Sequence, residues 1–154
     1  MVDLPRASQR LFDSVDFEAQ VHVFSEGTKT ADDAAAAIGC PVAAIVKSLV
    51  FVVGDEPVVA LVPGDLRLDT DKLSAAAGGG EVRRAGLDEV RDATGYVAGG
   101  TPPFGHATSL RVFADPALKR NEPVWAAAGT PSSVFPISIV DLDRLASPVW
   151  ITVT

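Results

Sequence analysis

Cysteine and histidine are scarce in this sequence, which has one cysteine, Cys40, and two histidines, His22 and His106. A lone cysteine excludes an intramolecular disulfide and a thiolate zinc cluster. Its position between Gly39 and Pro41, at a predicted corner between two helices, favours a structural role. The two histidines lack the spacing of a metal-binding pair such as His-x-x-x-His, so we expect neither a metal nor any other cofactor.

Long apolar runs are also missing. No stretch approaches the length of a membrane span, and the first residues lack the basic flank and apolar segment of a secretory signal. These absences predict a cytoplasmic protein that has no membrane partner.

Basic residues are outnumbered by acidic ones, and the net charge is −7. Broad binding to a phosphate backbone, as on DNA, usually needs a basic face, so this charge argues against it. A local contact with one end of an RNA stays open, because cations are available to surround the mouth of a small pocket. These cations are Lys29, Lys47, Lys72, Arg83, Arg84, Lys119 and Arg120.

Apolar residues make up 47% of the chain and charged residues 21%, which predicts one folded domain over residues 1–154. Periodicity and turn residues predict helices over 5–15, 31–38, 42–46, 73–77, 87–94 and 142–145. They predict strands over 20–24, 48–53, 58–62, 81–85, 108–113, 123–128, 134–139 and 149–153. We therefore expect an α+β fold with a mixed, mainly antiparallel twisted sheet, partly barrel-like, and short helices packed outside it.

The segment 95–106 holds four glycines and two prolines in twelve residues, which excludes a regular helix or a central strand. It is predicted to be a shaped loop, with free main-chain amides near the glycines and a stiff side at Pro102 and Pro103. His106, a side chain that titrates near neutral pH, ends the loop. The alternative is a rigid surface turn, since the spacing matches neither the P-loop nor the dinucleotide-binding fingerprint.

Lys47 lies where the predicted helix 42–46 gives way to the strand 48–53. One interpretation is that its apolar stem crosses the surface and its ammonium reaches water, which is the usual behaviour of such a lysine. The other is that packed elements hold the stem while the ammonium points into a pocket and interacts with an anion or a carbonyl. The residues alone favour the first interpretation.

Three features occur together in order: the helix from Thr30 to Gly39, the run Val46-Lys47-Ser48-Leu49-Val50-Phe51, and the loop 95–106. Over residues 8–146 the chain resembles the YbaK/EbsC family, the free-standing relatives of the prolyl-tRNA synthetase editing domain. The resemblance implies that fold and the hydrolysis of the ester of mischarged aminoacyl-tRNA. In the family the substrate is commonly tRNA-Pro carrying a small wrong amino acid such as alanine or cysteine.

The resemblance also implies site residues. Lys47 corresponds to the family's functional lysine, and Gly99-Gly100-Thr101-Pro102-Pro103 corresponds to its glycine-rich substrate loop, where a Ser-Pro pair is common. Thr101 departs from that pair and leaves the accepted amino acid open. Asp143 is an alternative to Asp141 as the acidic residue near the end of the family pattern. The candidate substrate-binding residues are Gly99, Gly100, Thr101, Pro102, Gly105, His106, Gly129 and Asp141.

Water is the expected nucleophile, because the chain has no serine in a Gly-x-Ser-x-Gly elbow and no cysteine–histidine pairing. The Lys47 ammonium and the Gly99–Gly100 amides are expected to face the ester carbonyl, and the resemblance implies that the substrate's ribose hydroxyl or amino group assists proton transfer. The expected partners are the aminoacylated acceptor end of tRNA and a prolyl-tRNA synthetase. The alternative function is a non-catalytic module that binds aminoacyl-tRNA or a nucleotide for a synthetase, and a general small-ester hydrolase comes third.

Overall fold

The computed structural model describes residues 4–24 and 30–154. The α-helices are α1 (Arg6–Asp13), α2 (Ala31–Ile38), α3 (Thr70–Ala76), α4 (Leu87–Thr94) and α5 (Ile139–Ala146), and the 3-10 helices are η1 (Val42–Ala44) and η2 (Pro116–Arg120). The strands are β1 (His22–Val23), β2 (Ile45–Val53), β3 (Glu56–Pro63), β4 (Val82–Arg84), β5 (Arg111–Ala114), β6 (Val124–Ala127), β7 (Ser133–Ile137) and β8 (Val149–Trp150). No helix in the described ranges is long and apolar enough to cross a membrane.

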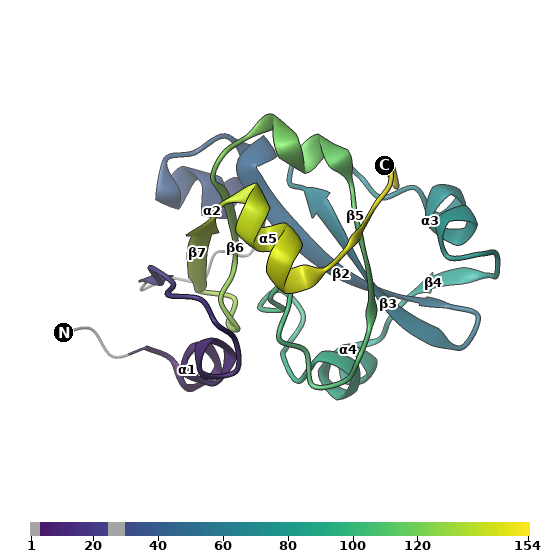
Figure 1. Cartoon of the computed structure of the whole chain (residues 1–154), viewed down its shortest axis with the longest axis horizontal. Helices are drawn as coiled ribbons and strands as arrows, with labels where there is room; N and C mark the ends of the chain where they lie inside the picture. The colour runs from purple at the N-terminus through teal and green to yellow at the C-terminus, as the bar shows by residue number, and fades with distance from the viewer. Residues whose placement is uncertain (1–3, 25–29) are drawn as a thin grey trace.

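The strands form one mixed sheet in the order β1-β7-β6-β2-β3-β5-β8, and β4 pairs with β2 beside this path (Figure 1). The pairs β1–β7, β6–β7, β2–β3 and β2–β4 are antiparallel, whereas β2–β6, β3–β5 and β5–β8 are parallel. The predicted α+β fold with a mixed sheet is confirmed. The sheet is open, however, because β1 and β8 at its two ends do not pair in the described residues, so the expected partial closure is not found.

The β2–β3 hairpin forms the centre of the molecule, and its register runs from Val46 opposite Pro63 to Val53 opposite Glu56. Both strands are apolar on both faces, as expected for strands that are covered on two sides. One face contributes Val50 and Leu61 to a core that α1, α4 and α5 cover. The other face contributes Phe51 to a core that α3 covers.

The second edge of β2 has two short partners instead of one long one. The strand β6 pairs with it only at Ile45 and Val46, and β4 pairs with it only from Phe51 to Val53. Within the described ranges, residues 47–50 therefore face no paired strand on this edge, and one hydrogen bond reaches them there, from the Ala85 amide to the Val50 carbonyl. We call this interruption of the sheet, from Lys47 to Val50, the notch.

The helix predicted over 31–38 is confirmed as α2: the Thr30 hydroxyl accepts the Asp33 amide at 3.1 Å, and Gly39 ends the helix with φ of 83°. The helix predicted over 42–46 is wrong beyond Ala44, because the chain extends from Ile45 onward to pair in parallel with β6. Lys47 is therefore inside a strand and not at the joint where the sequence placed it.

Candidate active site

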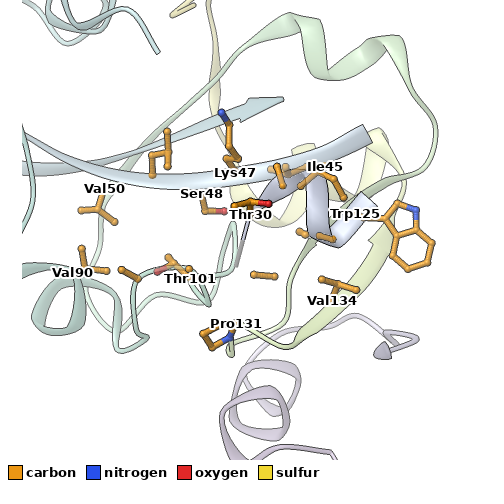
Figure 2. A pocket seen from close by; sticks show the side chains of 18 of the residues that line it. Thr30, Ile45, Lys47, Ser48, Val50, Val90, Thr101, Trp125, Pro131 and Val134 are labelled. Atoms are coloured by element: carbon orange, nitrogen blue, oxygen red, sulfur yellow. The ribbon is translucent and has the colours of Figure 1, made fainter. Parts of the chain in front are cut away.

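A pocket of about 370 Å³ opens at the notch (Figure 2). Residues 45–50 of β2 form one wall, and the other walls come from the start of α2, the β4–α4 junction, the loop after α4, and β6 with β7. The volume lies at the lower end of the range for small-molecule sites. Segments distant in sequence therefore meet around the interval of β2 that is paired with β3 on one edge and with neither β4 nor β6 on the other.

Apolar side chains line most of this pocket, among them Val46, Val50, Val90 and Val134. Hydroxyl groups are contributed by Thr30, Ser48, Thr101 and Ser133. Within the described residues the lining holds no carboxylate, histidine or cysteine, and its ionisable side chains are Lys47 and Arg84. No cluster of three or more potential metal-binding residues occurs in the described ranges either. A water molecule in the pocket would therefore find hydroxyls, but no group of the usual general-base type among the described lining residues.

Lys47 points to the face of β2 opposite Ser48 (Figure 2). Its ammonium donates a hydrogen bond to the Leu66 carbonyl at 2.7 Å. The pKa of Lys47 is lowered, chiefly because partial burial disfavours the charged form; Arg67 and Arg84 lower it further, while Asp65 acts in the opposite direction. Lys47 thus borders the pocket with its stem and holds its charge on the other side of the strand.

Arg84 lies on the same side of the sheet as Lys47. Its guanidinium sits over the Phe51 ring at 5.8 Å from the centroid, and Phe51 shares a strand face with Lys47 because the two are four residues apart. Arg67 directly follows Leu66, whose carbonyl holds the Lys47 ammonium. Three cations therefore gather beside the notch in a protein whose net charge is −7.

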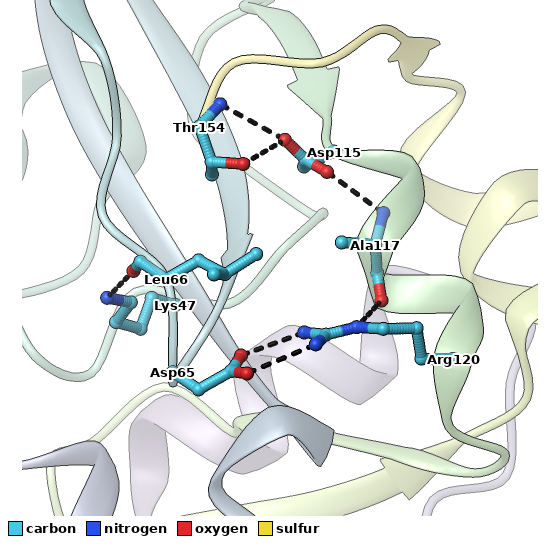
Figure 3. A network of polar contacts seen from close by, with 7 residues as sticks. All are labelled: Lys47, Asp65, Leu66, Asp115, Ala117, Arg120 and Thr154. Atoms are coloured by element: carbon cyan, nitrogen blue, oxygen red, sulfur yellow. Dashed lines mark hydrogen bonds and ion pairs between the residues drawn. The ribbon is translucent and has the colours of Figure 1, made fainter.

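The nearest carboxylate, Asp65, is already engaged (Figure 3). Arg120 donates two hydrogen bonds to it, at 2.8 and 3.1 Å, and this pairing lowers the pKa of Asp65. Beyond it Asp115 anchors the end of the chain by accepting hydrogen bonds from Ala117, Val153 and Thr154. Burial alone would raise the pKa of Asp115, but these hydrogen bonds outweigh it and the pKa is lowered. The segment that carries Asp65 and Leu66 is thus tied to η2.

The glycine-rich loop contributes Gly99 and Thr101 to the pocket lining. The Thr101 hydroxyl donates to the Val97 carbonyl at 3.0 Å and so closes the loop on itself. Gly100 faces away from the pocket, where a Cβ atom would lie 2.7 Å from the main chain of Thr130. Glycine is therefore required at position 100 for the loop to pack against the 129–133 turn.

His106 stands behind this loop and not in the pocket lining. Its Nε2 atom donates to the Pro102 carbonyl at 2.8 Å, and burial lowers its pKa so that the imidazole is neutral near pH 7. Gly105 packs against α1, where a Cβ would lie 2.5 Å from a Leu11 methyl group. In this structure Pro102, Gly105 and His106 shape the loop from behind.

Gly129 and Asp141 also lie outside the lining residues. Gly129 faces α1, and a Cβ there would come within 3.0 to 3.2 Å of Ala7. Asp141 is in the first turn of α5, bonded to the Ser138 hydroxyl and to Arg144. Asp143, the alternative, accepts the Trp150 indole N–H at 2.7 Å. Of the predicted site residues, the structure thus brings Lys47, Gly99 and Thr101 together at the pocket. The other predicted residues lie outside the pocket lining.

Ser48, Trp125 and Ser133 border the pocket and were not among the predicted site residues. Ser48 could have been found from the two-residue period of a strand, because it stands between Val46 and Val50 on the face opposite Lys47. Nothing local marks Trp125 or Ser133, which reach the pocket through long-range pairing of β6 and β7.

Comparison with known proteins is informative at this point. The family model described as "Aminoacyl-tRNA editing domain" matches residues 25–145. A solved structure of a candidate trans-editing enzyme for prolyl-tRNA synthetase superposes with a TM-score of 0.92 at 35% identity, covering 99% of both chains.

Two relatives extend this comparison. The candidate Cys-tRNA(Pro)/Cys-tRNA(Cys) deacylase EbsC of Enterococcus faecalis is 30% identical over 117 residues, which is 75% of this chain and 71% of EbsC. The proline–tRNA ligase of Geobacter sp. (strain M21) is 40% identical over 98 residues, which is 64% of this chain but only 17% of the ligase.

The chain belongs to the aminoacyl-tRNA editing-domain family. The family match covers most of its length, and the solved structure shares its fold from end to end. The resemblance to the YbaK/EbsC group, first suggested by Lys47 and the 95–106 loop, is thereby confirmed.

Proposed function

We propose that this protein is a trans-editing hydrolase that cleaves the ester bond of mischarged aminoacyl-tRNA, with tRNA-Pro carrying alanine or cysteine as its substrate. The observation that carries the proposal is the notch, which places an apolar pocket on one face of β2 and three cations on the other. The end of an aminoacyl-tRNA has two matching parts: a small amino acid on one side of the ester and nucleotide phosphates on the other.

The amino acid side chain would occupy the apolar part of the pocket, against Val50, Val90 and Val134. A hydrophobic pocket distinguishes side chains that differ by one methylene only by about 10- to 200-fold. Selection therefore depends on excluding larger amino acids sterically, and the small volume supports a second sieve that accepts what the synthetase activates by mistake.

The ester would cross the notch between β2 and the loop at Gly99. Negative charge develops on the carbonyl oxygen during hydrolysis, and preorganised donors stabilise it. The donors in the proposal are the main-chain amides of Gly99 and Thr101 and the Lys47 ammonium, which exchanges its hydrogen bond to Leu66 for one to the substrate. The Gly100 amide is not among them, because it donates to the Val97 carbonyl at 3.0 Å. Because the described lining offers no general base, the substrate would relay the proton of the attacking water: the free ribose hydroxyl takes it up while passing its own proton to the ribose oxygen that leaves.

The partners in this proposal are the acceptor end of tRNA and a prolyl-tRNA synthetase. The overall negative charge disfavours contact with a long stretch of RNA, whereas the cations beside the notch suit a few phosphates. The likeness to part of a proline–tRNA ligase supports an association with a synthetase that would hold the rest of the tRNA. Gly129 and Asp141 stay predictions as contributors to binding.

One observation favours the second candidate, a non-catalytic aminoacyl-tRNA or nucleotide-binding module. The described lining residues include no carboxylate or histidine that could activate water. Such a module would bind aminoacyl-tRNA at the same notch and protect the ester instead of cleaving it.

Single-turnover deacylation separates the two candidates. The substrates are tRNA-Pro charged with Ala, Ser, Cys, Thr or Pro, and the proteins are the wild type, Lys47→Ala and Lys72→Ala. Lys72 is a matched control because its ammonium is exposed and bonds the Thr154 carbonyl, away from the pocket lining.

We expect the wild type and Lys72→Ala to hydrolyse one or two small aminoacyl esters, and Lys47→Ala to lose about 100-fold or more, as when an electrostatic contact to the transition state is removed. If wild-type protein binds the charged tRNA but leaves every ester at its spontaneous rate of hydrolysis, the module is correct and the hydrolase is wrong.

A further inference from the structure

Ser48 occupies the middle of the notch. Along β2 the main-chain polar groups alternate between the two edges: the Ile45 carbonyl accepts the Gly64 amide on the β3 side, and the Val50 carbonyl accepts the Ala85 amide on the other side. Ser48 is two residues before Val50, so its main-chain groups point to the same edge as those of Val50. Its amide and carbonyl therefore face the notch, where neither β4 nor β6 pairs with it.

The side chain of Ser48 shows a second irregularity. Its Oγ atom is buried without a hydrogen-bond partner, and in the described residues no other side-chain nitrogen or oxygen is in this condition. The remaining hydroxyls of the lining are engaged: Thr30 accepts from Asp33, Thr101 donates to Val97, and Ser133 bonds Thr130. An unsatisfied buried hydroxyl destabilises a fold, so its retention calls for a partner from outside.

A ligand in the pocket can reach this hydroxyl. The oxygen itself is covered, but Ser48 as a residue is half-buried and borders the cavity on the same face as Val46 and Val50. Rotation about the Cα–Cβ bond exchanges staggered positions without moving the strand. The hydroxyl would then point toward Thr101, which lies across the pocket from β2 (Figure 2).

We propose that Ser48 positions the aminoacyl group, with its hydroxyl accepting a hydrogen bond from the α-amino group of the bound ester. This inference rests on the proposed editing function. The location fits that group, because the α-carbon adjoins the ester at the notch and the amino acid side chain continues into the apolar part. The Ser48 carbonyl, which faces the same opening, supplies a second acceptor, so one residue can take two of the amino group's hydrogens.

The consequence is selectivity for esters that carry an amino group. A hydrogen bond to a charged donor is worth a factor of about 10 to 100. A site with a polar group waiting for a partner rejects an analogue that lacks the partner more strongly than an apolar pocket rejects a missing methylene. Propionyl-tRNA, which has the shape of alanyl-tRNA without the amino group, is the corresponding probe.

The test compares the hydrolysis rates of two substrates by two proteins, so that the effect of the Ser48 hydroxyl can be separated from that of the amino group. Single-turnover rates at saturating and limiting protein are measured for alanyl- and propionyl-tRNA-Pro with wild type and Ser48→Ala. We expect Ser48→Ala to slow hydrolysis of the alanyl ester about 10- to 100-fold and to leave the propionyl ester within about twofold. Ser48→Thr, which keeps a hydroxyl, should restore discrimination between the two esters.

Thermal unfolding provides a second, independent test of the role of Ser48. Ser48→Ala removes an unsatisfied polar atom, so the melting temperature should rise by about 2–4 °C. The matched control is Ser8→Ala. The buried Ser8 hydroxyl donates to the Ala128 carbonyl and lies 3.3 Å from the Ser133 hydroxyl, so its removal breaks existing hydrogen bonds and should lower the melting temperature.

Three results would overturn the inference: equal losses on both esters, no loss on either, or a lower melting temperature for Ser48→Ala, which would make its hydroxyl structural. If wild-type protein hydrolyses no aminoacyl ester, the editing function itself fails and the inference falls with it. That outcome is distinct from an active enzyme that is indifferent to Ser48.

Discussion

The two faces of β2 differ in charge and polarity. Val46, Ser48 and Val50 turn toward the mostly apolar pocket, whereas Lys47, one residue away, holds a cation beside Arg67 and Arg84 on the other face. The alternation of a single strand is enough to produce this division, and the notch makes both faces accessible from one opening. The five consecutive residues from Val46 to Val50 can therefore contact both ends of a substrate that is apolar at one end and anionic at the other.

The largest effect should come from disturbing the wall that faces the apolar side. Gly100→Ala would bring a Cβ to 2.7 Å from the Thr130 main chain, which cannot yield as a side chain can. We expect a loss of about 2–3 kcal/mol in the free energy of unfolding, and a loss of deacylation with it. Urea denaturation measures the stability.

Gly99→Ala is the comparison for this change, because nothing lies within 4 Å of its Cβ and only its φ of 84° opposes the substitution. It should cost about 1 kcal/mol. Equal costs at the two positions would show that the contact between the loop and the 129–133 turn is not tight.

The next effect concerns the amino acid alone. Val50→Ala enlarges the apolar side of the pocket without touching a cation, so hydrolysis of a larger ester such as threonyl-tRNA should gain about tenfold relative to alanyl-tRNA. Competition between the two charged tRNAs measures the ratio. The slope of log affinity against log salt should not change, and a change in that slope would mean that the two faces are not independent.

A smaller effect is expected from the cationic face. Arg67→Gln and Arg84→Gln should each reduce the salt slope of tRNA binding by about 0.7, the value for one phosphate contact on a single strand, and leave amino acid selectivity as it was. Arg91→Gln is the control, since Arg91 is exposed on α4 outside the pocket lining. If all three variants share one slope, the cations beside the notch do not contact phosphate.

The smallest effect is a dependence of stability on pH through His106, behind the loop. Its pKa is lower in the folded protein than in the unfolded chain, because burial favours the neutral imidazole. The folded state therefore binds fewer protons, and this contribution is complete above the unfolded pKa, about 6.5, and is lost as the pH falls through the folded value.

Unfolding experiments between pH 7.5 and 5 should show a shallower decline for His106→Asn than for the wild type. Parallel curves would assign the acid sensitivity to other groups. The partly exposed Glu89, whose pKa is lowered to about 2 by the hydrogen bonds that it accepts from Arg83 and the Gly86 amide, stays ionised throughout this range.

Local signals in the sequence were sufficient for the elements that depend on neighbours along the chain. The Thr30 cap and Gly39 fixed the ends of α2, and the apolar runs on either side of the turn at Gly54 predicted the β2–β3 hairpin. The parallel pairing of β6 with Ile45 was not predictable in this way, because β6 lies about eighty residues later. For the same reason the notch, which exists only where β6 stops and β4 has not begun, has no signature in the run from Lys47 to Val50.

The candidate site, like the fold, was predicted only in part from the sequence. Lys47 entered through a family resemblance, since the residues alone favoured a lysine that extends to water, and the structure shows its ammonium bonded to the Leu66 carbonyl. Gly100 stays a prediction as a substrate contact, and the structure adds a packing reason for glycine there, because a Cβ would lie 2.7 Å from the Thr130 main chain. Ser48 was not among the predicted residues, although the two-residue period of a strand places it on the same face as Val46 and Val50.

The notch also bears on how this protein avoids aggregation. A strand with unpaired main-chain groups at a surface is a template for another chain, and proteins usually shorten, charge or cover such edges. Here the open interval is four residues long, from Lys47 to Val50, with β6 at one end and β4 at the other. A second β-strand would collide with these neighbours before it could form a ladder, whereas a small ester would not. The protein can therefore keep backbone donors and acceptors available to a ligand while staying closed to self-association through that edge.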